Sequence, residues 1–182
     1  GPDIYGPSVA TQINDVNVAT QVEIAGDFKL SIEATDPSGM GQVTAQTDMP
    51  FGSGIVLTRD GEKYSANIRI DNVPDGFYSI TVTAADSMGN TTVSRINVVV
   101  KWPIPDAPVI STPSTGLVVN DPSINVWGTA APYSNVQLFL NGSPFGSAIK
   151  AGGNGGFYAR VLFPVAGVYE VTASAKFGGA SG

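Results

Sequence analysis

The sequence of 182 residues contains neither cysteine nor histidine. The absence of cysteine excludes disulfide bonds, thiolate metal sites and cysteine nucleophiles. The absence of histidine removes the commonest general base and the commonest zinc ligand. These two gaps lower the expectation of catalysis sharply, and we expect that the protein is not an enzyme.

Long apolar runs are also missing. No stretch approaches the ~18 consecutive apolar residues of a membrane-spanning helix, and no segment keeps a 3.6-residue apolar period. We therefore expect no membrane span and no helix longer than a single turn. The apolar residues instead alternate with polar ones over short stretches, which is typical of strands with one buried face.

Charged residues make up only 13% of the chain, and they are unevenly distributed. Residues 3–102 carry twelve acidic and six basic side chains, which accounts for the whole net charge of −6. Residues 103–182 carry three of each sign. Because nucleic acid requires a basic surface, the first half argues against a nucleic-acid partner. The nearly uncharged second half suits contact with neighbouring modules or neutral polymers.

A nine-residue signature, G-x-Y-x-[I/V]-T-x-x-A, occurs at residues 76–84 and again at 167–175. Such an internal repeat indicates two similar small domains in tandem, each of roughly 90 residues. Three prolines between Pro103 and Pro108 restrict the backbone and mark the boundary. We expect domains at residues 3–102 and 103–182, with Trp102 packed as a structural residue at the junction.

The alternation predicts strands throughout both halves. In the first half they are expected at residues 28–34, 41–48, 54–58, 63–70, 77–85 and 91–100, with a hairpin turn at Asp60-Gly61. In the second half they are expected at residues 109–112, 123–129, 135–140, 157–163 and 168–175. Nothing after residue 175 corresponds to residues 91–100. The second domain is therefore expected to lack its last strand and to leave residues 168–175 at an unpaired edge.

The sequence resembles the bacterial immunoglobulin-like (Big-type) tandem repeats of large surface adhesins and secreted multidomain proteins. The residues that carry the resemblance are 34–39, 75–78 and 84–90 in the first half and 105–110, 128–138 and 167–169 in the second. The resemblance implies an all-β fold of two tandem immunoglobulin-like β-sandwiches. It also implies a non-catalytic spacer, stalk or adhesion module, located outside the bacterial cell or on its surface, with neighbouring repeats as partners.

Within this resemblance Tyr78 and Tyr169 fit the tyrosine-corner position, where the phenol hydroxyl bonds backbone a few residues upstream. Some members of the family hold calcium through loop carboxylates at one pole of the sandwich. That comparison places Asp36, Asp86 and Asn90 together, close to Asp3, as a candidate calcium site. The alternative is that each aspartate only caps its own turn. No other cofactor is expected.

The equivalent loops of the second domain carry Ala130, Ala131, Lys176 and Phe177 in place of these carboxylates. This departure from the family pattern argues against a calcium ion bridging the two domains.

The alternation around Trp127 does not settle which way its side chain points, but the resemblance implies that Val126 faces inward. Trp127 then points outward, beside Tyr158 and Arg160 of a neighbouring strand. An exposed cluster of this kind suits contact with a glycan or a protein receptor. The alternative is a packed surface cluster in which arginine lies over the aromatic rings. Two further functions stay open: a carbohydrate-binding accessory module, and an assembly subunit whose missing strand is donated by a partner.

Overall fold

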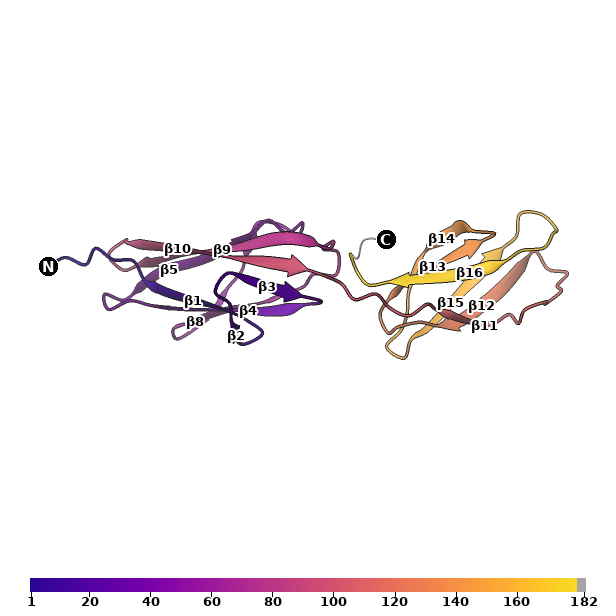
Figure 1. The fold of residues 1–182 in the computed structure, drawn as a ribbon, viewed down its shortest axis with the longest axis horizontal. Helices are drawn as coiled ribbons and strands as arrows, with labels where there is room; N and C mark the ends of the chain where they lie inside the picture. Colours follow the sequence, from indigo (N-terminus) through magenta and orange to yellow (C-terminus); the bar gives the residue numbers. More distant parts are fainter. Residues whose placement is uncertain (180–182) are drawn as a thin grey trace. The chain divides into compact units, whose positions relative to one another are not determined.

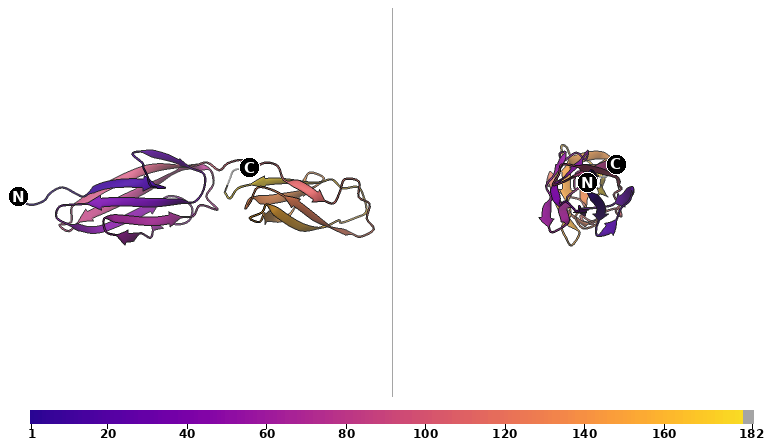
Figure 2. Two further views of the ribbon diagram at one scale, coloured as in Figure 1. Left: turned by 90° about the horizontal axis from the view of Figure 1, so that it is seen from below. Right: turned by 90° about the vertical axis from the view of Figure 1, so that its left-hand side faces the viewer.

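The computed structural model describes residues 1–179, which fold as strands, turns and loops without any helix (Figure 1). Two compact units are formed: unit 1 comprises residues 1–102 together with Gly179, and unit 2 comprises residues 103–178. Each unit consists of two sheets around an apolar core (Figure 2). The expected all-β fold of two immunoglobulin-like sandwiches is confirmed. No helix long and apolar enough to cross a membrane occurs in the described part of the chain.

Unit 1 contains ten strands. They are β1 (Ser8–Ile13), β2 (Val16–Asn17), β3 (Gln21–Ile24), β4 (Phe28–Thr35), β5 (Met40–Thr47), β6 (Gly54–Ile55), β7 (Thr58–Asp60), β8 (Lys63–Ile68), β9 (Gly76–Asp86) and β10 (Thr91–Val100). One sheet has the order β2-β1-β4-β8-β7 and the other has the order β3-β10-β9-β5-β6. Neighbouring strands run antiparallel, with the exception of β3, which lies parallel to β10.

The core of unit 1 follows from the alternation in its strands. In β4, Leu30, Ile32 and Ala34 are fully buried while Lys29 and Glu33 face solvent. The facing sheet contributes buried apolar side chains from β9 and β10 in the same way. Eighteen buried apolar residues form one continuous cluster between the two sheets.

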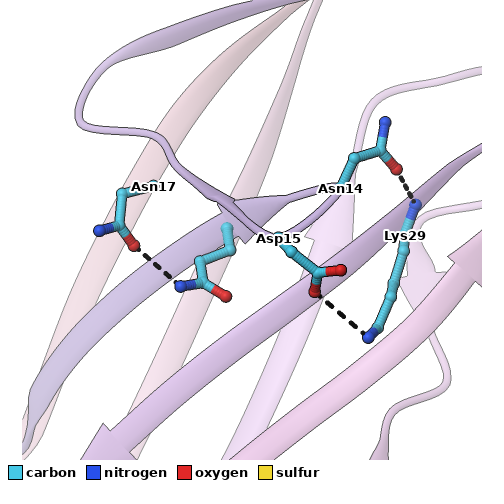
Figure 3. Close-up of polar contacts among 5 residues, drawn as sticks. Asn14, Asp15, Asn17 and Lys29 are labelled. Carbon is cyan, nitrogen blue, oxygen red and sulfur yellow. Dashed lines mark hydrogen bonds and ion pairs between the residues drawn. The ribbon is translucent and has the colours of Figure 1, made fainter.

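A tight turn at Asn14-Asp15 connects β1 to β2, and both turn residues have positive φ angles, of 51° and 64°. Asparagine and aspartate tolerate this left-handed conformation better than most side chains. Figure 3 shows how the turn is held to β4: the Lys29 N–H donates to Asn14 Oδ1 at 2.9 Å, and Lys29 Nζ lies 3.4 Å from Asp15 Oδ1. Beside the turn, Gln12 Nε2 donates to Asn17 Oδ1.

Unit 2 contains six strands among the described residues. They are β11 (Val109–Thr112), β12 (Ser123–Thr129), β13 (Asn135–Leu140), β14 (Ser143–Lys150), β15 (Gly156–Leu162) and β16 (Val171–Lys176). They form two three-stranded sheets, β11-β12-β15 and β14-β13-β16. Its cluster of buried apolar residues has only six members.

The repeated signature shows why the core of unit 2 is smaller. In unit 1, Ile80, Val82 and Ala84 of β9 are fully buried, because β10 pairs along the whole strand. The corresponding Val171, Ala173 and Ala175 of β16 are only half-buried. Within the described residues, β16 pairs with β13 on one side and with no strand on the other.

Several strands differ from the sequence-based expectation. Residues 54–58 were expected to form one strand, but β6 joins one sheet and β7 joins the other, with a break between them. Strand β16 begins at Val171 rather than at residue 168, because residues 163–170 form the loop that enters it. Four strands, β1, β2, β3 and β14, were not expected at all.

Candidate functional site

The two repeated tyrosines make the same contact in both units. The Tyr78 hydroxyl donates to the Pro74 carbonyl at 2.8 Å, and the Tyr169 hydroxyl donates to the Val165 carbonyl at 2.8 Å. Each bond spans four residues and pins the loop that enters β9 or β16. The pKa of Tyr78 is raised above 10.0 by desolvation and by the negative charges of Asp48 and Asp75. Its hydroxyl therefore stays protonated and able to donate at neutral pH.

Trp102 is fixed within unit 1. Its indole Nε1–H donates to the Val73 carbonyl at 2.8 Å, and its backbone N–H donates to Asp75 Oδ1 at 2.9 Å. The ring also packs against the apolar cluster of unit 1. These contacts anchor the ring and the backbone of Trp102 at the end of the unit, where the proline-rich segment follows β10.

Three carboxylates gather at one pole of unit 1, and we call Asp3, Asp36 and Asp86 the acidic pole. Their carboxylate oxygens lie within 4.8 Å of one another. Asp36 follows β4 and Asp86 ends β9, and Asp3 reaches them because the N-terminal segment is tied to β10. Gly6 permits this approach, since a Cβ there would lie 2.5 Å from the Thr91 carbonyl oxygen.

Each of these carboxylates also accepts hydrogen bonds from its own turn. Asp36 Oδ1 accepts from the backbone and hydroxyl of Ser38 at 2.8 and 2.6 Å. Asp86 Oδ1 accepts from the backbone N–H groups of Met88 and Asn90 at 2.8 and 2.9 Å. The turn hydrogen bonds that capping requires are therefore present. The close grouping of carboxylate oxygens that a calcium site requires is present as well.

Asn90 enters the acidic pole as a donor. Its Nδ2 donates to Asp86 Oδ2 at 2.7 Å and to the Asp3 carbonyl at 3.1 Å. Calcium takes six to eight oxygen ligands, whereas the side chain of Asn90 meets Asp86 through nitrogen. In this arrangement the amide nitrogen of Asn90 links Asp86 to the backbone of Asp3.

The ionisation of Asp86 follows from these contacts. Burial alone would raise its pKa, but the hydrogen bonds from Asn90, Met88 and Gly89 outweigh burial and hold the pKa below its usual 3.8. The side chain is therefore a carboxylate near neutral pH. A buried charge of this kind makes the hydrogen bonds of the turn charge-assisted, and such bonds are stronger than neutral ones.

The second candidate site lies on unit 2, where Trp127 of β12 is directly opposite Tyr158 of β15. The two ring centroids are 4.4 Å apart with an interplanar angle of 46°, and 52% of Trp127 and 43% of Tyr158 remain exposed. Gly128 next to Trp127 leaves room for the buried ring of Phe157 beneath the sheet, since a Cβ there would lie 2.3 Å from that ring.

Polar side chains continue the same face of the sheet. The Tyr158 hydroxyl donates to Asn125 Oδ1 at 3.0 Å, and Arg160 donates to the Ser123 hydroxyl oxygen through Nε and Nη2 at 3.3 and 3.0 Å. The Ser123 hydroxyl in turn donates to Asp121 Oδ1 at 3.0 Å. Within this cluster the guanidinium of Arg160 is therefore held by the hydroxyl of Ser123.

The pKa of Asp121 falls below its usual 3.8, because the Ser123 backbone and hydroxyl donate to it and Arg160 lies close. An open hollow of about 400 Å³ lies beside these groups and is lined by Asp121, Ser123, Ile124, Asn125, Tyr158 and Arg160. We call Ser123, Asn125, Trp127, Tyr158 and Arg160, together with Asp121, the β12–β15 surface. Sequence reasoning singled out the aromatic residues and Arg160 but missed Asp121, Ser123 and Asn125. Asp121, Ser123 and Asn125 occupy alternate positions before Trp127, but only the pairing of β12 with β15 shows that they gather beside Tyr158 and Arg160.

No family model matches the sequence, and no curated protein matches it. Among solved structures, it is similar to the fibronectin(III)-like modules of CbhA from Clostridium thermocellum, with 17% identity, a TM-score of 0.38 and coverage of 93% of this chain and 86% of that one. It is similar to the adhesin InvE from Yersinia pseudotuberculosis, with 13% identity, a TM-score of 0.38 and coverage of 97% and 61%.

A third similar structure is the endo-beta-1,4-mannanase from Thermotoga petrophila, with 13% identity and a TM-score of 0.43. That likeness covers 56% of this chain and 21% of the mannanase chain. The chain thus spans about a fifth of the mannanase and less than two thirds of InvE. Similarities at this level assign the chain to no family.

Proposed function

We propose that this chain is a non-catalytic, load-bearing spacer: two sandwich modules in series within the stalk of a bacterial surface or secreted protein. The partners in this role are neighbouring modules of the same parent chain. The extracellular location is supported by the resemblance of the sequence to bacterial immunoglobulin-like repeats. The proline-rich segment at residues 103–108 supports a limited range of angles between the modules.

The observation that carries the proposal is the parallel pairing of β3 with β10 in unit 1. Residues 21–24 pair in register with residues 97–100. Because β3 lies early in the chain and β10 ends the unit, tension on the chain pulls these two parallel strands in opposite directions along a common axis. Their hydrogen bonds are then loaded together in shear, which resists force better than bonds opened one after another.

Two further features add resistance in the same direction. Strand β1, the first of the chain, pairs with β4 over six residues. The tyrosine corners tie the entering loops of β9 and β16 to their own strands. A module that transmits tension needs this kind of closure near its ends, and the same corner recurs in both units.

Single-molecule force spectroscopy on the whole chain tests the proposal. We expect two unfolding events, with unit 1 yielding at the higher force because the described part of unit 2 has no parallel pair equivalent to β3 and β10. Val22→Pro removes a backbone donor inside β3, and we expect it to lower the unfolding force of unit 1. Val56→Pro is the matched control, because Val56 is 89% exposed and lies between strands.

The proposal fails if unit 1 yields at a force no higher than unit 2. It also fails if the two proline variants lower the force equally. Urea unfolding of the same variants separates a loss of mechanical resistance from a general loss of stability.

A further inference from the structure

The exposed rings of the β12–β15 surface are held in a fixed arrangement. Trp127 and Tyr158 touch each other across the strands, and the Tyr158 hydroxyl is bound to Asn125. The rings therefore cannot swing freely into other rotamers. Two adjacent aromatic residues that are each about half-exposed, with their ring planes tilted by 46°, form an apolar platform against which the C–H groups of a ligand can pack. Because the two side chains are already ordered, binding would cost little side-chain conformational entropy, which favours affinity.

Hydrogen-bonding groups border this platform on the same face. Asn125 lies between Trp127 and Ser123 along β12, and Arg160 is its cross-strand partner on β15. The Ser123 hydroxyl links Arg160 to Asp121, so the guanidinium and the carboxylate are both oriented. Their planar amide, guanidinium and carboxylate groups surround the open hollow beside Tyr158. From Ser123 to Trp127 the strand extends roughly 13 Å, which is long enough for more than one sugar ring.

The charge of this surface indicates which ligands suit it. Arg160 is balanced by Asp121 nearby, and residues 103–182 carry equal numbers of acidic and basic side chains. A phosphate-rich or sulfate-rich polymer would find no excess positive charge here. A neutral polysaccharide matches both the aromatic platform and the hydrogen-bonding groups beside it. Each pyranose ring offers an apolar C–H face for the aromatic platform and hydroxyl groups that donate and accept at its edge.

We propose that the β12–β15 surface binds a neutral polysaccharide. One sugar ring stacks on Trp127 and Tyr158, and a neighbouring ring places its hydroxyls against Asn125 and Arg160 at the hollow. This role goes beyond load bearing and does not depend on it. A spacer that carries such a surface would hold onto a glycan-rich matrix along its length.

The experiment titrates the whole chain with cellohexaose, mannohexaose and chitin hexasaccharide as neutral probes and with polygalacturonate as an acidic probe. Calorimetry measures affinity. In a Trp102→Phe background, fluorescence reports on Trp127 alone, because the chain has two tryptophans. We expect at least one neutral probe to bind and to shift the Trp127 emission. Trp127→Ala should weaken that binding at least about tenfold, since one stacking partner is lost.

Three further variants make the test specific. Trp127→Phe keeps a ring and should retain part of the affinity, while Asn125→Ala should weaken binding without removing the platform. Phe77→Ala is the matched control: Phe77 is 82% exposed on β9 of unit 1, and its loss should leave binding unchanged. Far-ultraviolet circular dichroism establishes that each variant is folded.

The proposal is overturned if no neutral probe binds, if polygalacturonate binds more tightly than every neutral probe, or if Trp127→Ala binds as well as the unaltered chain. A surface that ignores all glycans yet captures a protein receptor through Trp127 would overturn it as well. None of these results would affect the force measurements on unit 1.

Discussion

At the scale of single residues, the tyrosine corners show how one hydroxyl can hold a loop. Both Tyr78 and Tyr169 donate to a carbonyl four residues upstream, at the same distance of 2.8 Å. The hydroxyl crosses back over the loop and fixes its end against the strand that follows. Phenylalanine in either position would keep the ring and remove only this bond, so the contribution of the bond can be measured directly.

We expect Tyr78→Phe and Tyr169→Phe each to lower the unfolding free energy by about 0.5–1.5 kcal/mol, which is typical for one hydrogen bond. Urea titration measures the change. Tyr5→Phe is the matched control, since Tyr5 is 76% exposed and its hydroxyl makes no hydrogen bond within residues 1–179. This substitution should leave the unfolding free energy unchanged. An equal loss in all three variants would show that the corner bond contributes nothing specific.

The raised pKa of Tyr78 gives a second prediction for the same residue. The folded state holds the Tyr78 proton more tightly than the unfolded state does. The resulting contribution of Tyr78 to the unfolding free energy is fully present below pH 10.0 and is lost as the pH rises through the folded pKa. We expect the unaltered chain to lose stability above pH 10 more steeply than Tyr78→Phe does. Thermal melts from pH 9 upward measure this difference, and parallel curves for the two proteins would contradict it.

Asp86 titrates at the other end of the pH scale. Its pKa is lowered in the folded state, so its contribution is present above the unfolded value of 3.8 and is lost as the pH falls through the folded pKa. We expect Asp86→Ala to lower the melting temperature at pH 7 by roughly 5 °C and to flatten the fall in stability below pH 4. Asp106→Ala, at an exposed linker position, should leave the curve unaltered. A steep fall retained in Asp86→Ala would assign acid sensitivity to other carboxylates.

The effect of calcium on the melting temperature distinguishes the two interpretations of the acidic pole. If Asp3, Asp36 and Asp86 hold the ion, millimolar calcium raises the melting temperature of unit 1, and a chelator reverses the change. If the carboxylates only cap their turns, calcium has no effect on either unit. Asn90→Asp would replace the amide donor with another carboxylate, so it should strengthen calcium binding under the first interpretation and destabilise the pole under the second.

At the scale of strands, the difference between the units lies beside the repeated signature. Strand β9 is covered by β10, whereas β16 has a partner on one side only in the described part of the chain. The side chains at matching positions are fully buried in β9 and half-buried in β16. Less apolar surface is removed from water in unit 2, and the hydrophobic contribution falls accordingly.

We expect unit 2 to unfold at a lower urea concentration than unit 1, giving two transitions in place of one. Each unit has one tryptophan, Trp102 and Trp127, so their fluorescence reports the two transitions separately. In Trp102→Phe the remaining signal should follow the early transition, and in Trp127→Phe the late one. A single coincident transition in both variants would mean that the units unfold together.

How far the strands could be predicted depended on their local chemistry. Residues 91–100, 123–129 and 135–140 were expected as strands and have those bounds in the structure, because their apolar residues alternate between clear turns. Strand β14 was missed because it contains Pro144 and Gly146 and is largely exposed, so it has no apolar alternation to detect. The hairpin of β1 and β2 was missed because Asn14-Asp15 forms a left-handed turn without glycine or proline.

The candidate sites also contain residues that the sequence predicted and residues that it did not. The register taken from the resemblance to immunoglobulin-like repeats placed Trp127 beside Tyr158, since alternation did not settle which way Trp127 points, and the two residues are cross-strand partners in the structure. The polar residues around them look like any solvent-facing strand positions in the sequence, and only the pairing of β12 with β15 shows that they meet. Asn90 was expected beside Asp36 and Asp86 as a candidate calcium ligand. Its amide nitrogen also donates to the carbonyl of Asp3, 87 residues away in the sequence, and this contact leaves no signal in the sequence.

At the scale of the whole molecule, we expect the segment at residues 103–108 to limit how the units move with respect to each other. Its three prolines favour extended backbone and restrict φ. The absence of cysteine makes the question easy to test, since introduced cysteines are the only thiols. Arg95 and Ser143 are exposed positions in the two units and suit spin labels.

We expect the chain labelled at Arg95→Cys and Ser143→Cys to show a narrow distribution of label-to-label distances. Replacing Pro103, Pro105 and Pro108 with glycine should broaden that distribution, since glycine frees the backbone. Alanine at Lys101, Ile104 and Asp106 is the control and should leave it narrow. A distribution that is already broad in the unaltered chain would contradict the stiff segment.

Within residues 1–179, β16 has a partner strand on one side only, and we expect its other edge to affect how the protein behaves on storage. An uncovered strand edge offers unpaired N–H and C=O groups to any extended chain it meets, and half-exposed valine and alanine beside it make that meeting favourable. We therefore expect concentrated samples to form fibrils slowly, through pairing at the β16 edge of unit 2. Dilution, or Ser174→Lys on the exposed face of β16, should slow the formation of these fibrils.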